Sequence, residues 1–330
     1  MEHQSESILE VAYDPLLRQA EFPHSGLYFP YGAPLRLRTN SLRILEAARQ
    51  GWSVFTQLFD NPPIELHAGV AGASTGSVPP LPPVMRTQRH LFAVTGDAEH
   101  FGVCDFEAGF GYCWLSPRVL DDLDAVRYHF LDTLAFAMVA ERYLTGVHGA
   151  CVSWKGRGVL LCGESAAGKS TLAYACARRG FTFTSDDASF LVRAAQDRSV
   201  VGRPYSIRLR PSTEKLFPEL EGFLVTQHPN RKPSIEVSTQ DLGFAIAPRA
   251  NADVLVFLNR QPGQGVRLLP FSKQAALARM RQTLHYGREE SLREQHESLY
   301  RLLQADVYEM IYSDLDPAVD CLCELLEKGS

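Results

Sequence analysis

The pattern of apolar and polar residues divides this chain into a less regular first third and a more regular remainder. From residue 147 onward, short apolar runs alternate with amphipathic segments, as expected of strands and helices in an α/β domain. The pattern predicts strands over 150–154, 159–162, 181–185, 189–192, 253–259 and 307–312, and helices over 171–179 and 316–328. The glycine-containing turn 155–158 joins the first two strands into an antiparallel hairpin. We therefore expect an α/β domain with a mixed sheet over residues 147–330.

Residues 1–115 show a different pattern, with strands predicted over 34–38, 91–95 and 112–115. A helix is predicted from Ser41 to about Gly51, and Asn40 is suited to cap it. The stretch 69–84 is rich in Gly, Ser and Pro and predicts a surface loop, with a P-x-x-P ligand as the alternative. We expect a smaller α+β N-terminal domain that recognises the substrate or a partner.

One helical pattern is predicted between the two domains. Its apolar positions recur every three or four residues, namely Leu120, Leu123, Val126, Phe130, Leu134 and Met138. Ser116 and Pro117 provide a start signal, and Gly146 provides a stop. Residues 116–146 are therefore predicted to form a connecting helix that runs from 117 to about 144.

A phosphate-binding motif lies between the predicted strand 159–162 and the predicted helix 171–179. It reads Gly163-Glu164-Ser165-Ala166-Ala167-Gly168-Lys169-Ser170 and fits the P-loop (Walker A) pattern G-x-x-x-x-G-K-[ST]. Strand, glycine-rich turn and helix is the setting in which backbone N–H groups and the helix dipole bind phosphate. Lys169 is suited to the outer phosphates and Ser170 to Mg²⁺. We expect residues 163–171, including Thr171, to bind the nucleotide.

Two further features flank this motif. Asp186 and Asp187 follow a predicted strand and lie 17 and 18 residues after Lys169, and His148 lies 21 residues before it. A carboxylate at such a position can complete Mg²⁺ coordination, and a second one can accept a proton from an attacking hydroxyl. A solvated turn and a polar strand-edge histidine are the alternatives.

Composition narrows the class of protein. The 330 residues carry a formal charge of −5, with 45% hydrophobic and 22% charged residues. These values are ordinary for a globular protein and give no reason to expect nucleic-acid or anionic-membrane binding. Residues 1–10 are polar and acidic, unlike a secretory signal, and no apolar run approaches the length of a bilayer span. Seven scattered cysteines without a C-x-x-C pair favour reduced thiols and a cytoplasmic location.

The flanked P-loop resembles the kinase domain of the HPr kinase/phosphorylase family. The family's His-Gly, P-loop, Arg-Gly helix end and Asp-Asp pair correspond to His148-Gly149, Gly163–Ser170, Arg179-Gly180 and Asp186-Asp187. The resemblance implies ATP and Mg²⁺ as cofactors, a protein or peptide substrate with an acceptor serine, and homo-oligomers. It also implies that Asp187 accepts the serine proton, Ser170 and Asp186 hold Mg²⁺, and Lys169 and His148 complete the catalytic set.

The chain departs from that family after Asp187. The family's L-E-x-R-G-[LI]-G run is missing, and residues 202–210 read GRPYSIRLR instead. The resemblance is therefore to a divergent kinase of this family. Basic residues that could clamp phosphates or an acidic substrate are Arg208, Arg210, Arg231 and Lys232. A small-molecule kinase, an NTPase and a nucleotide-sensing module without significant turnover remain open as alternatives.

Overall fold

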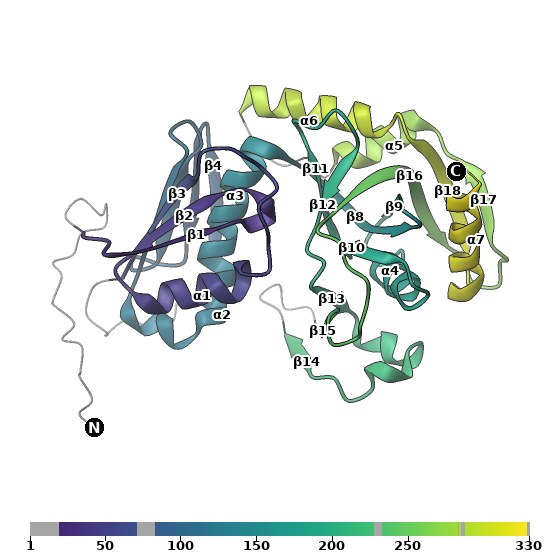
Figure 1. Ribbon diagram of the computed structural model, residues 1–330, viewed down its shortest axis with the longest axis horizontal. Helices are drawn as coiled ribbons and strands as arrows, with labels where there is room; N and C mark the ends of the chain where they lie inside the picture. Colours follow the sequence, from purple (N-terminus) through teal and green to yellow (C-terminus); the bar gives the residue numbers. More distant parts are fainter. Residues whose placement is uncertain (1–19, 71–82, 228–232, 283, 285–287, 329–330) are drawn as a thin grey trace. The chain divides into compact units, whose positions relative to one another are not determined.

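The computed structural model describes residues 20–70, 83–227, 233–282, 284 and 288–328. The chain divides into two compact units, Met1–Arg142 and Tyr143–Ser330 (Figure 1). Several predicted features lie outside the described residues: the segment 1–10, most of the predicted loop 69–84, and the basic residues Arg231 and Lys232. The division between the units falls inside the helical region that the sequence predicts as a connector.

The first unit is built on a seven-stranded sheet. Its strand order is β1 (His24–Tyr28), β2 (Leu35–Thr39), β3 (Ile64–Val70), β7 (Phe110–Leu115), β6 (Phe101–Asp105), β5 (Leu91–Thr95) and β4 (Val84–Gln88). Strand β3 is parallel to β2 and β7, and the other neighbours are antiparallel. In β2, Leu35 and Leu37 are buried, whereas Arg36 and Arg38 lie near Glu65 on the opposite face.

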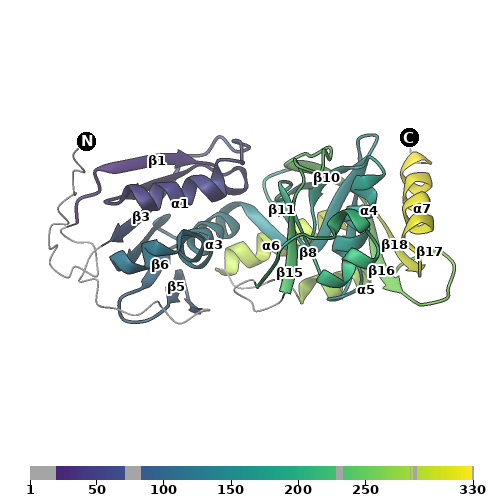
Figure 2. The same ribbon diagram turned by 90° about the horizontal axis from the view of Figure 1, so that it is seen from below.

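The helices of this unit correct two predictions. Helix α1 (Leu42–Trp52) runs alongside β1 (Figures 1 and 2), but Ser41 precedes it and Asn40 does not cap it. Instead, the Asn40 amide exchanges two hydrogen bonds of 2.8 Å with the backbone of Val70. A side chain satisfied by a neighbouring strand is no longer free to cap a helix.

The predicted helix over 117–144 is interrupted. The chain forms a 3₁₀ turn (Pro117–Asp121), α2 (Leu123–Val126), a π-helical turn (Arg127–Leu131) and α3 (Asp132–Tyr143). Asp122 explains the break because its carboxylate accepts a hydrogen bond from the Ala125 N–H at 2.9 Å and starts a new helix. Residues 144–146 belong to a strand, because Leu144 pairs with Val192 in the sheet of the second unit.

A buried hydrogen-bonded chain in the first unit has the residue types of a hydrolase triad. His100 contacts Asp97 Oδ1 through Nδ1 at 2.7 Å and Ser116 Oγ through Nε2 at 2.8 Å. His100 is fully buried and Ser116 is 2% exposed, so a substrate has no access to this hydroxyl. We interpret the three residues as a structural brace between β6 and the start of the helical segment.

The second unit contains the predicted mixed sheet. Its main path is β10 (Thr182–Ser185), β8 (Leu144–Trp154), β11 (Ala188–Val192), β12 (Ser199–Val201), β16 (Arg249–Arg260), β18 (Asp306–Tyr312) and β17 (Arg267–Pro270). Strand β9 (Arg157–Cys162) forms the predicted hairpin with β8 and is parallel to β16, which is in turn parallel to β18. The α/β prediction with a mixed sheet is confirmed.

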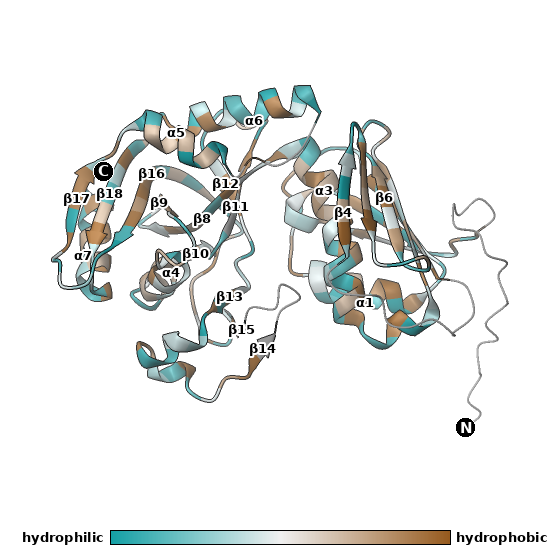
Figure 3. Cartoon of the chain, turned by 180° about the vertical axis from the view of Figure 1, so that it is seen from behind, coloured by the Kyte–Doolittle hydropathy of each residue, from teal (hydrophilic) through white to brown (hydrophobic). Residues whose placement is uncertain are grey.

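Helices cover both faces of this sheet. In β9, Val159 and Leu161 belong to a core with α4 (Lys169–Arg178) and α7 (Leu315–Glu327), whereas Leu160 and Cys162 face α5 (Lys273–Arg281) and α6 (Glu289–Leu302). Burial on both faces explains the continuous apolar run in this strand. In Figure 3, β16 in the middle of this sheet is largely apolar, whereas the covering helix α6 is largely hydrophilic.

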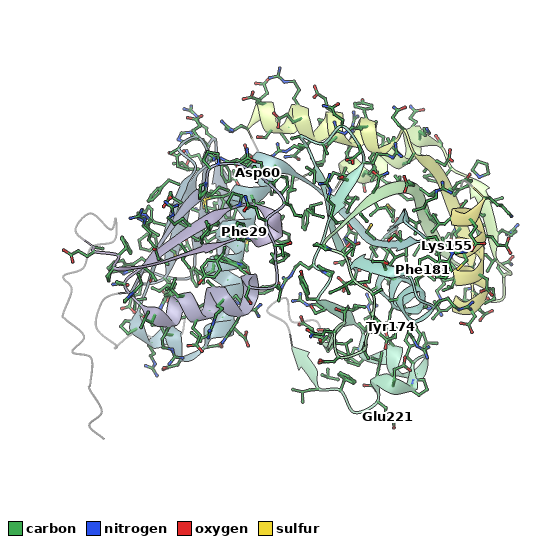
Figure 4. All side chains as sticks on the ribbon, viewed as in Figure 1. Phe29, Asp60, Lys155, Tyr174, Phe181 and Glu221 are labelled. Carbon is green, nitrogen blue, oxygen red and sulfur yellow. The ribbon has the colours of Figure 1, made fainter. Side chains whose placement is uncertain are left out.

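A small sheet of β13 (Ser206–Leu209), β15 (Pro233–Ser238) and β14 (Val225–Gln227) packs on α4. The ring centroid of Tyr174 on α4, labelled in Figure 4, lies 4.6 Å from the ring centroid of Phe217. Its hydroxyl donates to Glu219, which also pairs with Arg178 at 2.7 Å. Glu219 therefore serves as a brace between this region and α4.

Two predicted properties of the whole chain can be compared with the structure. Within the described residues, no helix is long and apolar enough to cross a membrane. All seven cysteines lie in described residues and none forms a disulfide. Burial raises the pKa of the thiols of Cys151 and Cys162 to about 12, so these two are inert apolar core residues.

Candidate nucleotide-binding and phosphoryl-transfer site

The P-loop has the strand, turn and helix that the motif predicts. Strand β9 ends at Cys162, and α4 begins at Lys169. Gly168 has φ +96°, and a side chain there would collide with the Tyr312 hydroxyl. A Cβ on Gly163 would lie 2.9 Å from Ala167 Cβ. Ala166 has φ +75°, a left-handed conformation that costs a non-glycine residue about 1 kcal/mol.

Lys169 is turned into the loop rather than toward solvent. Lys169 is 5% exposed, and its Nζ atom donates to the carbonyl oxygens of Gly163 at 2.9 Å and Glu164 at 3.1 Å. Its third partner is His148 Nε2, at 2.9 Å. Burial lowers the pKa of this ammonium, and the nearby Asp187 carboxylate opposes that effect. The positive charge therefore lies at the mouth of the loop, where the outer phosphates of a nucleotide belong.

His148 connects Lys169 to Asp187. The Nδ1 atom of His148 lies 3.3 Å from Asp187 Oδ1. Because an ammonium group only donates, Nε2 must accept from Lys169, which leaves the ring proton on Nδ1 to face the Asp187 carboxylate. The Asp187 carbonyl accepts from the Gly149 N–H at 2.9 Å, so the predicted His-Gly and Asp-Asp elements are joined through the backbone as well.

Ser170 contacts Asp186, the residue directly before Asp187. The Ser170 hydroxyl donates to the Asp186 carbonyl at 3.2 Å, and the Asp186 Oδ2 atom accepts from the Arg208 N–H at 2.7 Å. Burial raises the pKa of Asp186 to about 6, and the charge of Asp187 adds to the increase. A partly buried carboxylate that resists ionisation gains most from a bound cation, so Ser170 and Asp186 are suited to hold Mg²⁺.

This geometry predicts opposite effects of Asp186→Asn on stability and on metal use. The pKa of Asp186 is about 6 in the folded protein and 3.8 ordinarily, so ionisation of this carboxylate destabilises the fold. The loss of stability grows as pH rises from about 4 to 6 and is complete above that range. The neutral amide avoids this cost and its oxygen still accepts from Arg208. We expect a gain of about 1–3 kcal/mol in the free energy of unfolding at pH 8 and almost none at pH 4.

The same variant should need about tenfold more Mg²⁺ to reach half of the thermal stabilisation that Mg–ATP provides, because an amide is a poorer ligand for a hard cation. Thermal unfolding at the two pH values, with and without Mg–ATP, measures both effects. A lower melting temperature at pH 8 without nucleotide would contradict the role of the buried carboxylate.

The side chains of the predicted basic residues Arg208 and Arg210 do not join this cluster. The Arg208 side chain pairs with Glu236, its Nε atom lying 3.4 Å from Oε2. Arg210 follows the end of β13 and is exposed. In the described part of the chain, no group of three or more His, Cys, Asp and Glu side chains converges as a metal cluster. A Mg²⁺ ion held by one hydroxyl, one carboxylate and phosphate oxygens requires no such cluster.

Two residues near the P-loop carry no signal in the sequence. Tyr312, on β18, donates its hydroxyl to the Ala167 carbonyl at 2.9 Å and so helps to hold the loop in place. Arg279, on α5, lines a pocket beside the first residues of the loop. Neither belongs to a recognisable motif, and only the folded sheet brings them to this place.

Comparison with known proteins agrees with the features of this second unit. Residues 139–210 match the family described as HPr Serine kinase C-terminal domain. The match includes the P-loop, His148 and the Asp186-Asp187 pair, so this part of the chain is similar to that family's domain. The description of the family names a kinase-type activity.

A solved structure described as the Hpr(Ser) kinase/phosphatase from Coxiella burnetii is similar at 14% identity and a TM-score of 0.30. The alignment covers 56% of this chain and 89% of that one. No curated protein matches the chain.

Proposed function

We propose that this protein is an ATP-dependent kinase that transfers the γ-phosphate to a hydroxyl group, that of a serine, in a protein or peptide. The observation that carries this proposal is the chain of contacts from Asp187 through His148 to Lys169. It puts an exposed carboxylate next to the cation that belongs at the outer phosphates. A nucleotide-binding loop alone specifies binding, whereas a carboxylate at this position gives the means to activate an alcohol.

The residues divide the chemistry among them. Asp187 accepts the proton of the acceptor hydroxyl. At the same time the hydroxyl oxygen bonds to the γ-phosphorus, and the bond between the γ-phosphorus and the oxygen that bridges it to the β-phosphate breaks. Lys169 contributes positive charge at the outer phosphates. His148 holds the Asp187 carboxylate through Nδ1–H, and its Nε2 holds the ammonium group in the same network.

The nucleotide and its metal ion would be held by the loop. The backbone N–H groups of residues 163–171 are suited to the phosphates, and Ser170 with Asp186 to Mg²⁺. The bound metal would supply electrostatic stabilisation of the phosphate charge. Three features of this chain support that assignment. Helix α4 begins directly after Gly168, the Lys169 ammonium donates to the loop carbonyl of Gly163, and the Asp186 carboxylate resists ionisation without a cation.

We assign recognition of the acceptor to residues 1–115, because the P-loop domain lacks the family's run after Asp187. We propose that the kinase domain predicted over residues 147–330 also includes residues 144–146, which belong to strand β8, and that the preceding helical segment forms the connection. We also propose that the protein works in the cytoplasm as a homo-oligomer.

The direct test is an acceptor search. The protein is incubated with Mg²⁺, γ-labelled ATP and candidate proteins or peptides encoded by neighbouring genes, and mass spectrometry locates the modified residue. We expect a phosphoserine in one of them. Release of labelled phosphate to water with no modified acceptor would favour an NTPase, and nucleotide binding without either product would favour a regulatory module.

A further inference from the structure

A pocket of about 130 Å³ opens beside the first residues of the P-loop. Its wall includes His148, Gly163, Glu164, Phe257, Arg279 and Met280. The Lys169 ammonium contacts three of these six residues, through the ring of His148 and the carbonyls of Gly163 and Glu164. The pocket therefore adjoins the point where the P-loop lysine is placed, which is where the outermost phosphate of a nucleotide belongs.

Arg279 contributes the only cationic side chain among the described residues that line this pocket. Its guanidinium carbon lies 4.9 Å from the ring centre of Phe271 and 5.7 Å from that of Phe257. Stacking of this kind holds the planar group in place without neutralising its charge. Among the described residues, no carboxylate forms an ion pair with it.

The position of Arg279 follows from the sheet. Phe257 on β16 is paired in parallel register with Cys162 on β9, the residue directly before Gly163. Both side chains face α5, and α5 is fixed to that face by the buried residues Ala276 and Met280. An arginine stacked over Phe257 is thereby placed next to the start of the P-loop.

We propose that Arg279 is a second catalytic cation, whose guanidinium contacts the γ-phosphoryl group as it is transferred. This inference rests on the proposed kinase function and adds a residue to that site. Phosphoryl transfer spreads negative charge over three oxygens, and a guanidinium matches two of them at once. Arg208 is paired with Glu236 and is absent from the pocket wall, so it does not take this part.

The test compares a mimic of the transferring phosphoryl group with a mimic of bound ATP before transfer. Titration calorimetry measures Mg²⁺-dependent binding of ADP with aluminium fluoride, which mimics the transferring phosphoryl group, and of a non-hydrolysable ATP analogue. For Arg279→Gln we expect binding of ADP with aluminium fluoride to weaken by about 10–100-fold and binding of the ATP analogue to change less than about threefold. Arg279→Lys should fall between the parent and Arg279→Gln, because an ammonium lacks the fork.

Arg281→Gln is the matched control on the same helix. Its guanidinium donates to the Tyr300 hydroxyl at 2.7 Å and stacks on that ring, and it is not part of the pocket wall. It should bind both ligands like the parent. Equal affinity of Arg279→Gln and the parent for ADP with aluminium fluoride would overturn the proposal, as would a parent that binds this complex no better than ADP alone.

The acceptor search separates failure of the two proposals. If no acceptor is modified but Arg279→Gln still loses the aluminium fluoride complex, the kinase assignment is wrong and Arg279 keeps its contact with the outer phosphate. If an acceptor is modified equally well by the parent and Arg279→Gln, the kinase assignment holds and the role of Arg279 is wrong.

Discussion

Replacing Lys169 by alanine is expected to reduce phosphoryl transfer by about 10³-fold or more, because it removes the motif's cation at the outer phosphates. The fold should persist. Burial lowers the pKa of this ammonium, so the folded protein holds its charge at a cost, and this cost offsets part of the stability lost with its three hydrogen bonds. Thermal unfolding should therefore show a melting temperature close to that of the parent without nucleotide, and a much smaller increase with Mg–ATP.

Lys155→Ala is the control for this experiment. Lys155 lies at the turn between β8 and β9, is exposed, and pairs with Glu327 at 2.7 Å (Figure 4). Its removal should leave both phosphoryl transfer and stabilisation by nucleotide as in the parent. If Lys169→Ala transferred phosphate at the parent rate, the nucleotide would have to bind elsewhere and the P-loop assignment would fail.

Asp187→Asn is expected to lower turnover by about 10²–10⁴-fold while ATP affinity changes only a few-fold. The amide has nearly the same shape as the carboxylate, but it does not accept a proton at neutral pH. The backbone bond between the Asp187 carbonyl and Gly149 N–H is unaffected by this change, so the loop should keep its position. Single-turnover transfer to the acceptor, with nucleotide binding measured separately, distinguishes the two effects.

Asp186→Asn is the natural comparison because it alters the adjacent carboxylate. Its defect should recover as Mg²⁺ is raised, whereas that of Asp187→Asn should persist at saturating metal. If both variants phosphorylated the acceptor at the parent rate, the aspartate pair would be no more than a turn.

The sequence predicted the parts of this site that depend on local pattern. The apolar run 159–162, the two loop glycines and the helix that follows are contiguous, so one stretch of chain specifies strand, turn and helix. The approach of His148 to Asp187 was also predictable in kind, because the sequence predicts that each lies at the end of a strand near the loop; in the structure His148 lies within β8 and Asp187 between β10 and β11. Its geometry required the pairing of β8 with β11, which brings Ala188 opposite His148.

Other parts depend on tertiary contacts that no local pattern reveals. Tyr312 and Arg279 follow Lys169 by 143 and 110 residues and resemble ordinary strand and helix residues. Asn40 has the residue type of a helix cap, but the backbone of Val70 satisfies it instead. In the segment 117–144, the apolar periodicity was sound, whereas the capping carboxylate of Asp122 determined where the helix breaks.

The bond from Tyr312 to the Ala167 carbonyl has a consequence for the order of events on the ribosome. The whole P-loop motif is synthesised by residue 170, yet Tyr312, which helps to hold the loop in place, is added more than a hundred residues later. The strand β16, beside β9, also comes after the motif, and β18 is added last of the three. A nascent chain or fragment that ends at residue 210 therefore contains every residue of the motif but not the support of its loop. Nucleotide capture at the proposed site should begin only once the chain has passed residue 312, so a bound nucleotide should not guide the early folding of the P-loop.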